Sequence, residues 1–497
     1  MENVDGNENS SSEGAAVRVY DAVRALAFIG DLSMGQPTDH SLRTAWLAAQ
    51  LARTAGDGEA GAATAAEVSL LRWSGCTANA SEFADLLGDD IASRAAMLAA
   101  RPDWEKPLDS HGGVKTVIGP LAQIHCEVSG EVARMLRFTA DSEAALRHIF
   151  EAWDGTGFPE RLAGASVPRT VLVVSLAGDL EIFSRVYGLP RALALIAERA
   201  GRRYPAEWSA LVASEAQHWL GALERMEPAR LDETIITPQM GETTSIELIA
   251  DVIDLKLPWM TGYSRSVARM ASACHAQLGG AKEKGPYLYA AGLIHGIGRA
   301  AVPNAIWNSP GRLTAAAWEQ VRLVPYWTSR AGKQTGTLAS AAELASCAYE
   351  RLDGSGYFRG AGGSALSFDA RVLSAAVAYV ALGSPRPWRP ALAPAEVAQR
   401  LRLEAAEGRF DAEVVEALIE LKDAPPRGAR SRHKAGLSAR EIDVLRSISR
   451  GASNKEAARE LDLSPSTVRT HVESAFRKLE CSTRAAATLK ASALGLI

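Results

Sequence analysis

The sequence contains two long related segments, one after the other, and this repeat limits the fold more than any other feature. Three pairs of motifs recur in the same order: DHSLRTAWLA (39–48) with GYSRSVARMA (262–271), LLRWSG (70–75) with LIHGIG (293–298), and WDGTGFP (153–159) with LDGSGYF (352–358). The first two pairs also share one offset. Shared order and spacing of this kind indicate a duplicated structural unit rather than chance similarity between alanine- and leucine-rich stretches.

The hydrophobic pattern within both segments is helical. Ala45, Ala48 and Ala52 recur at intervals of three and four residues, which places them on one face of a helix. One apolar run, VLVVSL at 171–176, could form a buried strand, but helical patterns surround it on both sides. We therefore predict an all-α protein with two helical units and a third, smaller helical domain.

Composition divides the chain into six parts. We predict a disordered N-terminus at 1–15, a first helical domain at 16–226, a linker at 227–244, a second helical domain at 245–422, a Pro/Gly linker with four cations at 423–436, and a helical domain at 437–497. The net charge of the whole chain is −4, yet residues 427–497 carry 14 Lys/Arg against 7 Asp/Glu. A basic tail behind an acidic body favours a polyanion as the partner of the tail, although a solvated basic face would look the same.

The second helical domain resembles the HD-GYP family of metal-dependent phosphohydrolases. Three separated motifs carry the resemblance in the family's order, at 293–325, 349–360 and 383–396. The resemblance implies helices that hold two or three metal ions, usually iron or manganese, and a bound hydroxide that attacks a phosphodiester of a cyclic dinucleotide.

Most positions that should hold metal ligands carry other residues. In the second domain only one of seven positions keeps its ligand type, and the set reads Tyr263, His295, Gly296, Val324, Ala348, Tyr349 and Val377. In the first domain His40 and His125 match, and the other positions carry Arg72, Trp73, Ile149, Phe150 and Gly178. Hard divalent metals need several carboxylate and imidazole donors, so we expect no catalytic residue, no metal site and no cofactor.

The replaced ligands predict a vestigial pocket with apolar and aromatic walls. Its candidate residues are His40, His125, Tyr263, His295 and Tyr349. Such a pocket suits a small-molecule effector, but a filled core with a structural or dimerising role would have the same composition. His148 and Asp179 lie one residue from ligand positions, which leaves a residual mononuclear site in the first domain as a further alternative.

Residues 437–497 are punctuated as four short helices. Ser438–Glu441 and Ser453–Glu456 form capping boxes, and Ser464 precedes a helix that has Pro465 in its first turn. The block resembles the LuxR-type DNA-binding domain along its whole length, through the string LSAREIDVLRSISRGASNKEAARELDLSPSTVRTHVESAFRKL. The resemblance implies a helix-turn-helix whose second helix enters the major groove.

The candidate DNA-binding residues lie on or near that second helix. Thr467, Arg469 and His471 would approach bases or phosphates. The other candidates are exposed polar or basic residues suited to the recognition face or to backbone phosphates: Lys455, Arg459, Ser464, Ser466, Thr470 and Lys478. The fourth helix, from Thr483, is the expected dimer face, although it could instead pack on its own domain.

We therefore predict a transcriptional regulator whose non-catalytic HD-GYP-like body senses a ligand or mediates dimerisation. Double-stranded DNA and a second copy of the chain are the expected partners. No apolar run reaches the ~18 residues of a membrane span, and the five isolated cysteines favour a reducing cytoplasm. Two alternatives remain: a metal-dependent cyclic-dinucleotide phosphodiesterase with a DNA-binding domain, and an oligomeric scaffold that binds no DNA.

Overall fold

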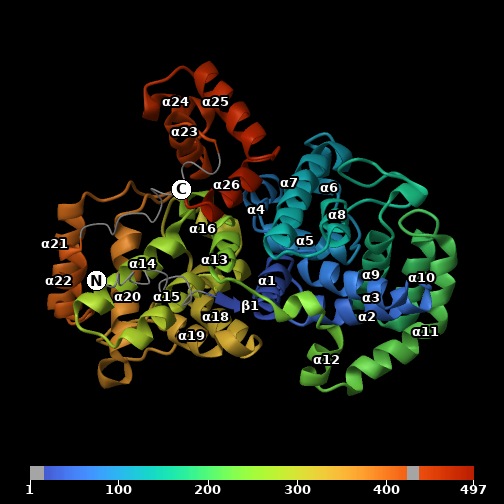
Figure 1. Cartoon of the computed structure of the whole chain (residues 1–497), viewed down its shortest axis with the longest axis horizontal. Helices are drawn as coiled ribbons and strands as arrows, with labels where there is room; N and C mark the ends of the chain where they lie inside the picture. The colour runs from blue at the N-terminus through green and yellow to red at the C-terminus, as the bar shows by residue number, and fades with distance from the viewer. Residues whose placement is uncertain (1–15, 422–435) are drawn as a thin grey trace, which may run out of the picture.

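The computed structural model describes residues 16–421 and 436–497, and nearly all of its regular structure is helical (Figure 1). The all-α prediction is confirmed. The expected disordered N-terminus lies outside the described residues, as does the Pro/Gly linker apart from Gly436. No described helix has the length and apolar character that a membrane crossing requires.

The first unit begins with a short strand and continues through helices α1 to α12. Its elements are β1 (Ala16–Arg18), α1 (Val19–Ser33), α2 (His40–Thr54), α3 (Gly58–Leu71), α4 (Ala80–Leu87), α5 (Asp90–Leu98), α6 (Lys106–Asp109), α7 (Val114–Met135), α8 (Ala140–Arg147), α9 (Arg169–Tyr187), α10 (Leu189–Arg199), α11 (Ala206–Arg225) and α12 (Pro228–Ile235). The apolar run at 171–176 lies within α9, where it is buried as part of a helix rather than as a strand.

The second unit repeats the central helices of the first. Its elements are β2 (Thr243–Ser245), α13 (Glu247–Asp254), α14 (Tyr263–Gln277), α15 (Gly285–Ile294), the 3₁₀ helix η6 (Ile297–Ala301), α16 (Asn304–Trp307), α17 (Ala315–Arg322), α18 (Val324–Lys333), α19 (Ala339–Ala345), α20 (Phe368–Leu382), α21 (Pro394–Ala406) and α22 (Ala412–Glu420). α2 and α14 each begin at the second residue of the paired motifs 39–48 and 262–271, and each has 15 residues. α9 and α20 likewise follow the paired motifs 153–159 and 352–358. The repeated motifs therefore lie on or beside equivalent elements.

The two units share one hydrophobic core. β1 pairs with β2 in an antiparallel register that places Val17 opposite Thr244, so the starts of the two units lie side by side. α1 is buried along its whole length and packs against α3 of its own unit and against α13 and η6 of the other. The segment expected as a linker at 227–244 is largely structured, since it contains α12, a 3₁₀ turn and the start of β2.

The C-terminal domain consists of four helices that stand out from the body at the top of Figure 1. They are α23 (Ala439–Ser449), α24 (Asn454–Leu461), α25 (Pro465–Lys478) and α26 (Arg484–Ala493). A separate small core joins them, built from residues such as Ile442, Leu445 and Val468. α26 lies at the base of this domain and packs against α7 and α13 of the body.

Candidate ligand site and DNA-binding surface

Each unit has a buried aspartate at its centre, held by the same two hydrogen bonds. Asp31 accepts hydrogen bonds from the backbone N–H of Ser41 (3.1 Å) and from its hydroxyl (2.6 Å). Asp254 accepts the equivalent bonds from Ser264 at 2.8 and 2.7 Å. Burial raises the pKa of both carboxyl groups to about 6, against the lowering effect of nearby cations. The two centres are thus built alike.

In the first unit an arginine side chain occupies the centre. Arg72 follows α3, and its Nη2 donates to Nε2 of His40, while its Nη1 lies 3.4 Å from the carbonyl oxygen of Val174. A Cβ atom at Gly178 would meet Nη1 of Arg72 at 2.1 Å, so the guanidinium fills the space of a side chain at position 178. Burial lowers the pKa of Arg72 to about 10, and Asp31 and Glu181 partly offset this effect.

The two histidines of the first unit lie on either side of Arg72. His40 donates from Nδ1 to Glu181 (2.5 Å), which fixes Nε2 as the acceptor for Arg72. His125 donates from Nε2 to the backbone carbonyl of Arg72 (2.7 Å), and burial lowers its pKa to about 3. Both imidazoles are therefore engaged in the hydrogen-bond network of the core.

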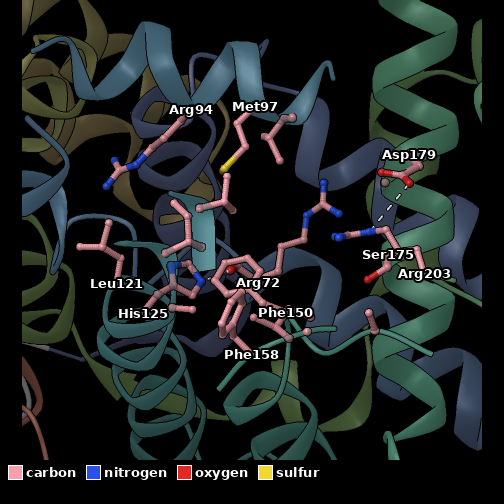
Figure 2. A pocket seen from close by; sticks show the side chains of 18 of the residues that line it. Arg72, Arg94, Met97, Leu121, His125, Phe150, Phe158, Ser175, Asp179 and Arg203 are labelled. Carbon is pink, nitrogen blue, oxygen red and sulfur yellow. Dashed lines mark hydrogen bonds and ion pairs between the residues drawn. The ribbon is translucent and has the colours of Figure 1, made fainter. Parts of the chain in front are cut away.

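A cavity of about 670 Å³ opens beside this centre (Figure 2). Aromatic side chains form part of its wall, among them Trp73, Phe150 and Phe158. Five arginines and one lysine also line it: Arg72, Arg94, Arg199, Arg202, Arg203 and Lys115. Of the predicted pocket residues, His125 alone lines this cavity, whereas His40 lies behind Arg72.

Sequence reasoning missed most of these cations. Three of them, Arg199, Arg202 and Arg203, stand close together at the end of α10 and just after it, in the string RAGRR. That local concentration of arginine was the available signal. Their approach to α9 is visible only in the fold, where Arg199 donates to Asp179 at 2.7 Å.

The centre of the second unit is filled by side chains. Arg299 donates from Nη2 to Nε2 of His295 (2.8 Å) and from Nη1 to Asp254 (3.1 Å). The ring of His295 lies 5.7 Å from that of Tyr263 and 6.3 Å from that of Tyr349. Burial lowers the pKa of His295 to about 3. The structure thus gathers these three predicted pocket residues, but in a different unit from His40 and His125.

The residues at the two centres do not fit the metal cluster that the HD-GYP resemblance implies. Within 16–421 and 436–497, no three His, Cys, Asp or Glu side chains converge as a metal site would require. Arg72 and Arg299 each bring a positive charge to the position beside the histidine. No step of a reaction can therefore be assigned to a metal ion on these residues.

The capping predicted for the C-terminal domain is present. Ser438 and Glu441 form a reciprocal capping box at α23, as do Ser453 and Glu456 at α24. The hydroxyl of Ser464 accepts from the backbone N–H of Thr467 at 3.0 Å and starts α25. These local bonds fix where α23, α24 and α25 begin, and α24 and α25 are the two helices of the helix-turn-helix.

The outer face of α25 is exposed and polar. Ser466, Thr467, Arg469 and Thr470 are exposed, His471 is half-buried, and Val468 faces the small core. On α24 and the turn, Lys455, Arg459 and Ser464 are also exposed. Most of the predicted DNA-contact residues are therefore open to solvent, on helices α24 and α25 that stand out from the body in Figure 1.

Two of the candidate cations form ion pairs within the domain. Arg469 donates to Glu473 at 2.7 Å on the exposed face, an ion pair that water can readily exchange. Lys478 donates to both carboxylate oxygens of Glu441 at 2.8 and 2.9 Å, and thereby ties the end of α25 to the start of α23. Its contact with a phosphate stays a prediction.

α26 is packed on the body. Lys490 lies 3.3 Å from Glu131 of α7, and its Nζ also donates to the carbonyl oxygen of Leu479 (2.7 Å). The backbone N–H of Ser482 donates to Glu127 (2.5 Å), again on α7. Residues 486–492 are all buried. The face expected to form a dimer is thus covered by the protein's own body in this structure.

Comparison with known proteins assigns two parts of the chain. Residues 247–414 match the model of the HD domain, and residues 435–491 match that of bacterial regulatory proteins of the luxR family. A 53-residue stretch of the chain is 43% identical to the nitrate/nitrite response regulator protein NarP of Escherichia coli, covering 11% of this chain and 25% of that protein.

The body has relatives that span both units. A 3′3′-cGAMP-specific phosphodiesterase 3 of Vibrio cholerae is 25% identical over 419 residues, which cover 78% of this chain and 91% of that protein. The crystal structure of a cyclic GMP-AMP-specific phosphodiesterase of V. cholerae, V-cGAP3, superposes with a TM-score of 0.59 at 22% identity, over 82% of this chain and 99% of that one. The second comparison shows a shared fold.

These relatives correct one prediction. We expected a non-catalytic body and a protein that is not an enzyme. The comparisons contradict this expectation, because a relative that aligns with both units is named as a phosphodiesterase. Substituted ligand positions were a poor guide, and the alternative considered from the sequence is the better supported one. The motifs, the fold and the comparisons together show that the chain carries an HD domain and a C-terminal regulatory domain of the luxR family.

Proposed function

We propose that this protein is a cyclic-dinucleotide phosphodiesterase with a DNA-binding domain. The body binds a 3′3′-linked cyclic dinucleotide and hydrolyses it, as the names of its relatives indicate for them. Binding of the nucleotide also changes the position of the helix-turn-helix domain. The observation that carries the proposal is the arginine-rich cavity of the first unit, in a body alignable over most of its length with a 3′3′-cGAMP-specific phosphodiesterase.

The cavity has the chemistry that such a ligand requires. A cyclic dinucleotide presents two anionic phosphodiesters, which suit guanidinium groups, and two purine bases, which suit aromatic walls. Arginine and aromatic side chains line the same cavity, and its volume lies within the range of about 300–1,000 Å³ typical of small-molecule sites.

α7 offers a physical route between the cavity and the DNA-binding domain. Leu121 and His125 on one side of this helix line the cavity. Glu127 and Glu131, further along the same helix, contact Ser482 and Lys490 of the C-terminal domain. A ligand that shifts α7 would change the docking of α26, so the cyclic dinucleotide would act as effector as well as substrate.

Homodimer formation belongs to the same proposal. LuxR-type domains that read two half-sites need a face through which two copies meet, and α26 is our candidate for that face. Because the body covers α26, release of this helix would have to precede pairing. A protein that reads DNA in a bacterial cell would work in the cytoplasm.

The enzymatic part is tested with the purified full-length chain. We expect 3′3′-cGAMP to bind and to be converted to the linear dinucleotide, and to be preferred over cyclic di-GMP and cyclic di-AMP. Calorimetry measures binding, and chromatography of the nucleotide measures turnover. Failure of all three nucleotides to bind and to be hydrolysed would refute the proposal.

The DNA-binding part is tested on α25. Replacement of Arg469 by alanine should weaken binding to DNA selected from a random library by about tenfold or more and relax base preference. Lys455→Ala should instead lower the slope of the logarithm of DNA affinity against the logarithm of salt concentration by about one, with little change in sequence preference. Gel shifts over a salt series measure both effects.

The matched control for Arg469→Ala is Arg402→Ala. Arg402 lies on α21 of the body, pairs with Glu416 and is exposed, so its loss changes the net charge equally. If Arg469→Ala and Arg402→Ala bind DNA alike, the recognition role of α25 is wrong.

A further inference from the structure

Two arginines extend into the cavity of the first unit from different elements. Arg72 comes from the end of α3, and Arg203 from the loop after α10. Figure 2 shows the two side chains reaching into the cavity toward one another, with Asp179 beyond Arg203. The proximity of Arg203 disfavours the charged form of Arg72, which indicates that the two guanidinium groups repel each other. Two like charges thus face the same cavity.

Donors on both arginines are buried without a partner. Nε of Arg72 and Nε of Arg203 have no hydrogen-bond acceptor within the described chain, and the indole N–H of Trp73 in the same wall has none. Arg72 as a whole is 4% exposed. Buried donors are usually paired in folded proteins, and these three belong to residues that line one cavity, where an acceptor on a ligand would satisfy them.

Two other arginines of the cavity are already engaged. Arg94 donates to the carbonyl of Ser33, the carbonyl of Cys76 and the side chain of Asn79. Arg199 is paired with Asp179 at 2.7 Å, whereas Arg203 lies 3.9 Å from the same carboxylate. Arg72 and Arg203 therefore each keep a buried Nε donor without an acceptor in the described chain.

The position of Arg72 explains how this pair arises. Gly178 leaves open the space that the Arg72 guanidinium occupies, beside His40 and near the buried carboxylate of Asp31. A fixed cation thus lies at the centre where the HD-GYP resemblance would put a metal ion. An anion that bridges Arg72 and Arg203 would relieve their repulsion and satisfy their free donors.

We propose that Arg72 and Arg203 form a clamp for one phosphodiester of the ligand, and that this clamp binds the phosphate without a divalent metal ion. The inference rests on the proposed function for the identity of the ligand, and it adds the residues and the independence from metal. A planar guanidinium fork matches two phosphate oxygens, which a single lysine ammonium does not.

The test is calorimetric titration of 3′3′-cGAMP into the full-length chain, once in EDTA and once in Mn²⁺. The wild-type chain should give the same Kd in both buffers. Arg203→Met should weaken binding at least about tenfold, the loss expected when a charge-assisted hydrogen bond is removed. Arg203→Lys should fall between the two, because it keeps the charge but not the fork.

Arg191→Met is the matched control. Arg191 lies on α10 and pairs with Glu198 outside the cavity, so the same loss of charge should leave the Kd within about twofold of wild type. Circular dichroism verifies that each variant folds, which is expected for Arg203 because its side chain is 38% exposed.

The outcomes separate the clamp from the proposed function. Binding that requires Mn²⁺, or that is unchanged in Arg203→Met, overturns the clamp and leaves the phosphodiesterase proposal standing. Absence of binding by the wild-type chain in both buffers overturns the clamp together with its ligand.

Discussion

Replacement of Asp90 by alanine is expected to lower the free energy of unfolding by about 3–5 kcal/mol. Asp90 is fully buried at the start of α5 and lies 3.1 Å from Nζ of Lys256, which belongs to the second unit and is also buried. It also accepts from the backbone N–H of Asn304 at 2.7 Å. Its removal would leave a buried ammonium group without its carboxylate. Urea denaturation followed by circular dichroism measures the effect.

A second substitution tests the physical reason. If the cost comes from the unpaired charge, Lys256→Met added to Asp90→Ala should recover much of the loss, because an apolar pair avoids the desolvation of two ions. Glu59→Ala is the control, since it removes a carboxylate from an exposed pair with Arg53 and should leave the urea midpoint near that of wild type. A double variant no more stable than Asp90→Ala would contradict this account of the interface.

The C-terminal domain was predictable almost residue by residue because its signals are local. A capping box joins residues three apart, as in Ser438–Glu441 and Ser453–Glu456, and both are present. Gly451 follows the end of α23 with a φ of +96°, a conformation that a glycine adopts without strain. Such features need no knowledge of the rest of the fold.

The two units were predictable as a repeat, but their junction was not. Recurrent motifs fall on equivalent helices, since the motif at 39–48 lies on α2 and its counterpart at 262–271 lies on α14. The strands that join the units, β1 and β2, are very short and pair although the whole first unit separates them in the sequence. Strands this short carry no hydrophobic period, and their pairing depends on contacts far away in sequence.

The candidate site was predictable in composition but not in arrangement. The sequence groups His40, His125, Tyr263, His295 and Tyr349 as candidates for one pocket, whereas the fold divides them between two centres. The open space at Gly178, and not any property of Arg72 itself, decides where the guanidinium lies. The cavity therefore depends on two residues that lie far apart in the sequence, a contact that periodicity and motif spacing do not encode.

The counting of metal ligands also misled the functional prediction. It treated the loss of ligand residues as the loss of function, yet the body remains alignable with a phosphodiesterase over 419 residues. Arg72 and Arg299 each place a positive charge at the centre of one unit. A search for histidines and carboxylates does not detect these arginines.

The centre of the second unit should give two opposite pH dependences of stability. His295 has a folded-state pKa of about 3, against about 6.5 when unfolded, so the unfolded chain binds the proton first as the pH falls. From pH 6.5 to 4 the wild-type chain should therefore lose about 3 kcal/mol of unfolding free energy relative to His295→Gln, at about 1.4 kcal/mol per pH unit. The difference between the two proteins, measured by urea denaturation at each pH, isolates this histidine.

Asp254 should behave in the opposite sense, because its folded-state pKa of about 6 lies above the unfolded value of 3.8. As the pH falls from 6 to 4 the folded chain binds the proton first, so the wild-type chain should gain stability relative to Asp254→Asn, by about 2 kcal/mol. The exposed His111 provides the control substitution, because His111→Gln removes an imidazole outside the buried centre. Both residues contact Arg299, so equal slopes for His295→Gln and Asp254→Asn would mean that the buried centre does not hold these groups in opposite protonation states.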